Sequence, residues 1–177
     1  MTKRTKLTIA AAIAAAVSAT VATPAQAKVL KFNVALDGKY GAEPTGSAAT
    51  ARAKVRVDTA TRRVSVDMDV AGITVDQLWD KLVAAPAGPI HFHKYATAAG
   101  GPSVLALPLP YNADYRATRS GIRVKMRDYD YVAGAKIVNS TLSFDDFVAG
   151  MQSGLIVLNV HTDAFNPGEI SGLVVAD

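Results

Sequence analysis

All three histidines of this 177-residue chain lie in two short segments that could together bind a metal ion. Residues 88–94 contain His91 and His93, and residues 155–162 contain His161. Alternate side chains of a β-strand point to the same face, so His91 and His93 would lie side by side. If a neighbouring strand brought His161 to them, three imidazoles would form a mononuclear site with one open coordination position, which suits copper or zinc.

Four further residues could complete or support this site. Asn159 would share a strand face with His161, and Thr162 follows that histidine directly. Glu43 and Glu169 are the only glutamates in the chain, and either could add an oxygen ligand. The alternative role of the histidines is structural, because half-buried imidazoles often hold turns through hydrogen bonds to backbone groups. The sequence leaves both interpretations open.

A basic segment forms a second candidate site. It contains the cations Arg119, Arg123, Lys125 and Arg127, with tyrosines on either side of them. Such a segment could bind an anionic polysaccharide or another polyanion through charge and cation–π contacts. Aspartates in the same segment reduce its net charge, so a solvated strand face is the alternative interpretation.

The chain contains none of the common catalytic motifs. It has no cysteine nucleophile and no Gly-x-Ser-x-Gly segment. Asp145 and Asp146 are adjacent, but their position after Ser143 is typical of a helix start, where carboxylates interact favourably with the helix dipole. These observations favour a protein that is not an enzyme.

The first 27 residues have the three features of a secretory signal peptide. A basic start with Lys3, Arg4 and Lys6 precedes an Ala-rich apolar run, and residues 25–27 (Ala-Gln-Ala) form a cleavage site. A lipoprotein anchor would need a cysteine, and the chain has none. The sequence therefore predicts export to the periplasm or the extracellular medium, without membrane attachment after cleavage.

The remaining residues, 28–177, are enough for one domain. They carry 16 basic and 15 acidic side chains, a balance that does not favour nucleic acid as a partner. Apolar and polar residues alternate at 51–58 and 63–70, which predicts a hairpin with one wet face. Further strands are expected at residues 28–36, 91–93, 104–109, 155–162 and 173–175.

Two short helical patterns occur in the connections, at residues 74–82 and 143–154. The first would place Trp79 in the core. Residues 111–136 show alternation at Ile122, Val124 and Met126 but no clear set of elements. Many strands, few helices and no alternation of strands with helices favour an all-β, antiparallel sandwich.

Several segments in this order resemble the signatures of a known family. Residues 159–162 (Asn-Val-His-Thr) followed by 167–172 (Pro-Gly-Glu-Ile-Ser-Gly) resemble the closing signature of the CHRD domain. Residues 89–93 (Pro-Ile-His-Phe-His) with 100–102 (Gly-Gly-Pro) resemble its other signature, and residues 41–44 (Gly-Ala-Glu-Pro) resemble its early element. This domain is repeated in chordin and is widespread in exported bacterial proteins.

The resemblance implies that residues 28–177 are one CHRD domain with an immunoglobulin-like β-sandwich, distantly similar to copper–zinc superoxide dismutases. No activity is established for the family as a whole, and in chordin the domains belong to an extracellular protein that sequesters growth factors. By analogy we expect a non-enzymatic binding or structural module with a protein or polysaccharide partner. The alternative is a mononuclear copper or zinc protein with superoxide-type redox chemistry, since three histidines are too few for the dinuclear site of those enzymes.

Overall fold

A computed structural model describes residues 28–40, 44–98, 100–111 and 114–177 of the chain. The expected signal peptide and Glu43 therefore lie outside the described residues. No helix among the residues described is both long and apolar enough to cross a membrane.

The described residues form one antiparallel sheet of nine strands, in the order β5-β4-β8-β9-β1-β2-β3-β7-β6. All neighbouring strands pair in the antiparallel sense. The strands are β1 Val29–Asp37, β2 Thr50–Asp58, β3 Arg63–Ala71, β4 Ile90–Thr97, β5 Gly100–Leu109, β6 Asp114–Ala117, β7 Gly121–Asp130, β8 Ile156–Val160 and β9 Ile170–Ala176. The expectation of an all-β antiparallel domain is confirmed.

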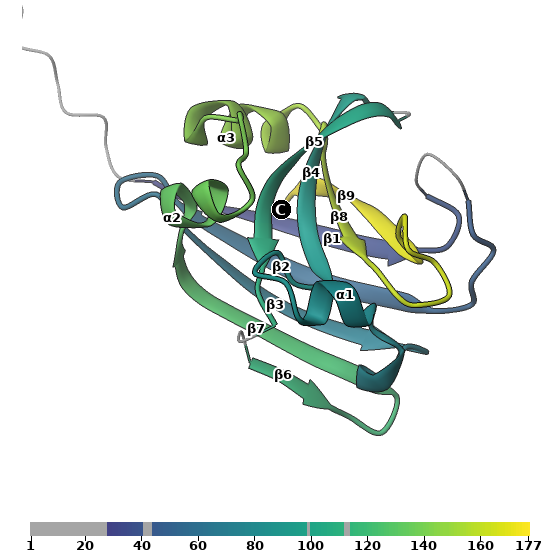
Figure 1. The fold of residues 1–177 in the computed structure, drawn as a ribbon. Helices are drawn as coiled ribbons and strands as arrows, with labels where there is room; N and C mark the ends of the chain where they lie inside the picture. Colours follow the sequence, from purple (N-terminus) through teal and green to yellow (C-terminus); the bar gives the residue numbers. More distant parts are fainter. Residues whose placement is uncertain (1–27, 41–43, 99, 112–113) are drawn as a thin grey trace, which may run out of the picture.

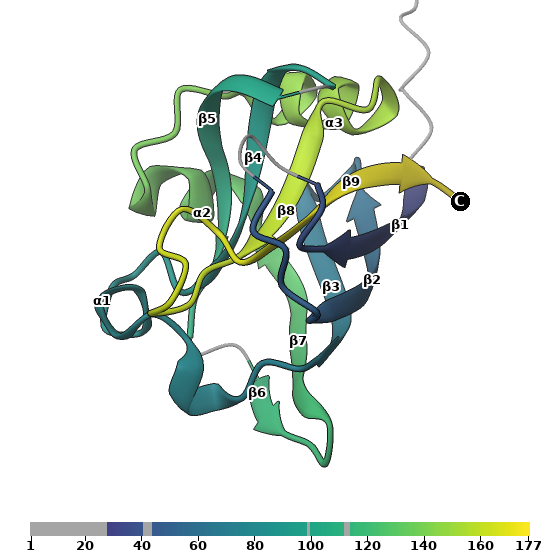
Figure 2. The same ribbon diagram turned by 90° about the vertical axis from the view of Figure 1, so that its right-hand side faces the viewer.

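The sheet is strongly curled, so that its β5-β4-β8 half faces its β2-β3-β7 half (Figures 1 and 2). Apolar side chains of both halves belong to one core cluster, including Phe92 and Leu158 from one half and Val66 and Met68 from the other. The strands are continuous through hydrogen bonding from β5 to β6. The finer expectation, an immunoglobulin-like sandwich, is not confirmed by this arrangement.

The β2–β3 hairpin follows the sequence pattern closely. Its inward positions are buried, as at Val55 and Val66, whereas the charged residues between them stay at least partly exposed. Cross-strand pairing runs without a break from Thr50 opposite Ala71 to Asp58 opposite Arg63. Strict alternation specifies this register, because a slip of one residue would expose the whole apolar face.

Short helices connect the strands: the 3-10 helix η1 Val75–Gln77 and the α-helices α1 Asp80–Val83, α2 Tyr131–Ile137 and α3 Phe144–Gln152. The expected helix at 143–154 is confirmed as α3, and Ser143 caps it by accepting a hydrogen bond from the Asp146 amide. The expected helix at 74–82 is instead two short pieces separated by Leu78 and Trp79. Helix α2, capped by Asp130, was not expected from the sequence.

The core position expected for Trp79 is wrong. Leu78 is fully buried and Trp79 is only half-buried, because Leu78 forms an isolated β-bridge with Thr162 and turns inward. The aromatic core is built by the last two helices instead. Phe147 of α3 packs edge-on against Phe92 at 5.7 Å between ring centroids, and Tyr131 of α2 lies 4.9 Å from Phe147.

Candidate metal centre

The pairing of β4 with β8 brings the histidine segments together. His91 lies opposite Asn159 and His93 lies opposite Val157 in this antiparallel pair, two strands that are adjacent in Figure 2. His161 directly follows β8, and its amide donates to the carbonyl oxygen of Pro89 at 2.9 Å. The chain therefore leaves β8 at the point where β4 begins, next to His91.

The three imidazoles form a cluster. Their ring centroids are 4.3 Å apart for His91 and His161, 4.8 Å for His91 and His93, and 6.3 Å for His93 and His161. One nitrogen from each ring can be chosen so that all lie within 4.8 Å of one another. In a tetrahedral zinc site with bonds of 2.0–2.1 Å, ligand nitrogens are roughly 3.4 Å apart. Side-chain rotations that bring the nitrogens up to about 1.4 Å closer together would thus suffice for one ion.

Two backbone carbonyls determine the tautomers of His91 and His161. Nδ1 of His161 lies 2.7 Å from the carbonyl oxygen of Asn166, and Nδ1 of His91 lies 3.3 Å from that of Gly88. A carbonyl oxygen only accepts hydrogen bonds, so each Nδ1 carries the hydrogen and each Nε2 keeps a lone pair. This is the usual arrangement of metal-binding histidines, whose second nitrogen donates to a carbonyl or carboxylate.

Among the described residues, His93 has no hydrogen-bond partner at either ring nitrogen, although both nitrogens are buried. Nε2 of His161 is likewise buried without a partner in the part of the chain that the structure describes. A buried polar atom left unsatisfied costs about 1–3 kcal/mol, so such atoms call for an explanation. Hydrogen bonds that hold turns account for the carbonyl contacts of Nδ1 in His91 and His161. They do not account for the buried, unsatisfied nitrogens of His93.

Burial keeps the three imidazoles neutral near pH 7. Loss of solvation is the main cause that lowers the pKa of His93 from 6.5 to about 4, and the charge of His161 adds to it. Burial, followed by repulsion from the other two rings, holds the pKa of His91 well below 6.5. Burial also lowers the pKa of His161, partly opposed by its hydrogen bond to Asn166. Neutral imidazole is the form that binds metal ions.

Two aromatic rings that the sequence did not point to lie beside the cluster. Trp79 is 6.5 Å from His161, and Tyr95 is 6.5 Å from His93, measured between ring centroids. The Trp79 amide donates to the carbonyl oxygen of His161 at 3.1 Å, which holds this segment against the site. Tyr95 could have been found by strand periodicity, because it continues the His91 and His93 alternation.

Glu169 and Asn159, the candidates with side-chain oxygens, have surroundings that differ from each other. The Glu169 carboxylate accepts hydrogen bonds from the hydroxyls of Ser47 and Thr162, both at 2.6 Å, and so joins the loop before β2 to the β8–β9 connection. Among the described residues, the group of potential ligands around the cluster contains only the histidines. Asn159 is buried opposite His91, and its Oδ1 has no hydrogen-bond partner in residues 28–40, 44–98, 100–111 and 114–177.

The basic candidates are spread along β7 and the turn before it. Arg123 forms ion pairs with Asp67 at 2.6 Å and with Asp69 at 3.0 Å, and Lys125 lies 3.9 Å from Asp67. Arg119 and Arg127 are exposed. The structure thus joins Arg123 and Lys125 to carboxylates of β3, a pairing that the sequence did not reveal.

Fold and site together define the class: an all-β antiparallel domain with a cluster of three imidazoles, two on strand β4 and one directly after the adjacent strand β8. Residues 32–174 match the family model of the CHRD domain. The chain therefore belongs to the CHRD domain family, as its motifs indicated. No curated protein and no solved structure matches the chain.

Proposed function

We propose that this CHRD-domain protein is an extracytoplasmic binding module that holds one copper or zinc ion between His91, His93 and His161. The observation that supports it best is the set of buried, unpartnered nitrogens on His93 and His161 within a cluster whose ligand atoms lie within 4.8 Å. A bound cation would satisfy these atoms, and the carbonyl contacts already orient two of the rings.

The ligand set also bears on the identity of the ion. Three neutral imidazoles suit copper and zinc, whereas magnesium and calcium prefer oxygen ligands. At one site of this kind copper(II) binds more tightly than zinc(II). A fourth position remains for water or a small external ligand, which is the requirement for the redox chemistry of the alternative function. Binding without catalysis needs only the three imidazoles.

Export and a sandwich-type fold are part of the same proposal. Residues 1–27 carry the pattern of a signal peptide, and cleavage after Ala27 would start the mature chain at Lys28. N-terminal sequencing of the protein recovered from the periplasm or medium tests this. The two facing halves of the curled sheet share one core, which supports kinship with immunoglobulin-like and superoxide-dismutase-like sandwiches.

The direct test is metal titration of the mature protein, residues 28–177, after treatment with a chelator. We expect one copper(II) or zinc(II) ion per chain by calorimetry and elemental analysis. A free metal concentration of about 1,000 Kd should stabilise the fold by about 4 kcal/mol. His93→Gln should abolish binding without removing a side-chain hydrogen bond to any described residue.

Lys94→Gln is the matched control, since it changes the next residue of β4 but none of the proposed ligands. The proposal fails if wild-type protein binds neither ion at micromolar concentration. It also fails if His93→Gln binds metal as tightly as Lys94→Gln.

A further inference from the structure

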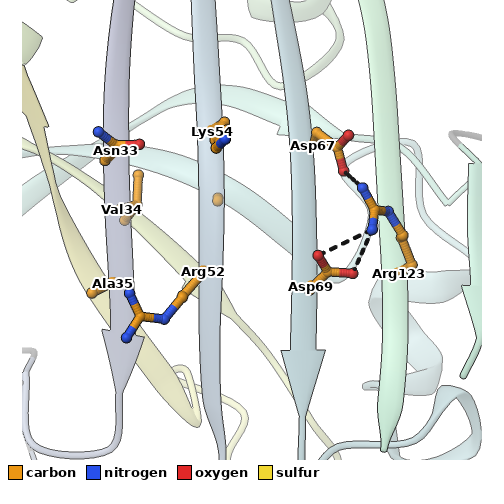
Figure 3. A pocket seen from close by; sticks show the side chains of 9 residues that line it. Asn33, Val34, Ala35, Arg52, Lys54, Asp67, Asp69 and Arg123 are labelled. Carbon is orange, nitrogen blue, oxygen red and sulfur yellow. Dashed lines mark hydrogen bonds and ion pairs between the residues drawn. The ribbon is translucent and has the colours of Figure 1, made fainter. Parts of the chain in front are cut away.

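The outer face of β1, β2, β3 and β7 carries three adjoining hollows of about 430, 360 and 450 Å³, all lined in part by Lys54. Figure 3 shows the first of them. Seven cationic and four anionic side chains line the three hollows, so this surface has a net charge of +3. Residues 28–177 as a whole have only one more basic than acidic side chain. Positive charge is therefore concentrated on this surface, which we term the β2 face.

Two of the four carboxylates of the β2 face, Asp67 and Asp69, form ion pairs within the protein. Asp67 and Asp69 of β3 lie opposite Lys54 and Arg52 of β2 in the sheet register. Both carboxylates nevertheless bind Arg123 of β7, the strand that pairs with β3 on the side away from β2. In Figure 3 they point to Arg123, while the Arg52 side chain runs toward β1.

Three cations of β2 are left without an ion pair. Arg52, Lys54 and Arg56 are exposed, and none has a carboxylate within 4.0 Å among the described residues. Alternate residues of a strand are about 6.6 Å apart, so these side chains form a straight row about 13 Å long. Lys31 of β1 lies directly opposite Arg56, a like-charge pair that destabilises the sheet. A bound anionic chain would relieve this repulsion.

We propose that the β2 face binds an acidic polysaccharide along the row Arg52, Lys54 and Arg56. The row offers regularly spaced positive charges beside adjoining hollows, one lined by Arg52 and Lys54 and the next by Lys54 and Arg56, which matches a linear chain of carboxylate or sulfate groups. Protein interfaces usually centre on buried aromatic anchors and contain few lysines, unlike the exposed strand positions of this face. Single-stranded nucleic acid is bound on aromatic stacking platforms, and β2 has no aromatic residue.

This binding site is independent of the histidine cluster. None of the three histidines lines any of the three hollows, and the clustered histidines lie on or next to β4 and β8. The acidic polysaccharide would therefore bind whether or not a metal ion is present, and either proposal can fail without the other.

The test measures binding of labelled alginate to the mature protein at 50 and 150 mM NaCl, with dextran as the neutral probe. The triple variant Arg52→Gln, Lys54→Gln, Arg56→Gln removes the row. Each exposed ion pair changes an affinity by about 1.4- to 5-fold, so the variant should bind alginate about 3- to 150-fold more weakly. Wild-type binding should weaken at the higher salt concentration, because exposed charges are screened.

A second triple variant, Lys39→Gln, Lys81→Gln, Lys136→Gln, is the matched control. It removes the same charge from exposed positions outside the β2 face, and none of the three lysines forms an ion pair within the described part of the chain. We expect less than a twofold change in its alginate affinity. Equal weakening by the two triple variants, or wild-type binding to dextran as tight as to alginate, would overturn the proposal. Preferential binding of oligothymidylate over alginate would overturn it in favour of a nucleic-acid ligand.

Discussion

Lowering the pH from 7 to 5 should destabilise the metal-free protein through His93. The pKa of this residue is about 4 in the folded protein, compared with 6.5 for an unperturbed histidine. Between these values the unfolded chain binds a proton at His93 and the folded chain does not. Stability is therefore fully present above pH 6.5 and is lost as the pH falls.

The size of the loss follows from the two pKa values. Because the pKa of His93 shifts from 6.5 to about 4, this residue alone should lower the unfolding free energy by about 2 kcal/mol between pH 7 and pH 5. His91 adds to this loss, because burial and the neighbouring imidazoles hold its pKa well below 6.5.

Urea unfolding of chelator-treated protein at pH 7, 6 and 5 measures the effect. The unfolding free energy of His93→Gln should fall by about 2 kcal/mol less than that of the wild type over this range, since an amide does not titrate. Lys94→Gln should show the wild-type pH dependence. If His93→Gln and the wild type lose the same stability, the imidazole is not the desolvated group that its burial implies, and the reasoning is refuted.

Three further substitutions, together with a control at Gly46, test the fold around the site. A Cβ at Gly172 would overlap the backbone carbonyl of Ala35, so Gly172→Ala should lower the unfolding free energy, measured with urea, by at least about 3 kcal/mol. Gly46→Ala is the control: it lies in open space and should lower the unfolding free energy by only about 1–2 kcal/mol, because its backbone is left-handed. Equal losses would contradict the close approach of β9 to β1. Glu169→Gln cannot accept both of its hydroxyl hydrogen bonds and should lower the unfolding free energy by about 1–2 kcal/mol; an unchanged urea midpoint would show that these bonds add nothing. Phe147→Ala should cost about 3–5 kcal/mol in the same assay, and a loss under 1 kcal/mol would contradict its place in the aromatic core.

Local periodicity predicted the strands well where one face of the sheet is exposed to solvent. The alternation in β2 and β3 appears in the structure with the expected residues buried. The pattern was weaker between residues 111 and 136, where β6, β7 and α2 follow one another closely. A bulge in the β3–β7 pairing between Val64 and Val66 interrupts the register there, and no local pattern encodes it.

Trp79 illustrates where the sequence pattern failed. A helical period across residues 74–82 would bury it together with Leu78 and Leu82. The bridge between Leu78 and Thr162 breaks the helix, so that only Leu78 is fully buried and Trp79 lies beside His161. That bridge joins residues 84 positions apart, and local helix propensity carries no information about it.

The sequence by itself determined which side chains share a strand face, because side-chain alternation is a local property of extended backbone. Alternation alone places His91 with His93 on one face of their strand, and Arg52 with Lys54 and Arg56 on one face of theirs. Only the tertiary structure decided which strands are neighbours. The β4–β8 register sets His161 beside His91, and the β3–β7 pairing turns two carboxylates away from β2. Such pairings depend on how the whole sheet buries its apolar face, so they follow from the complete fold rather than from any short segment.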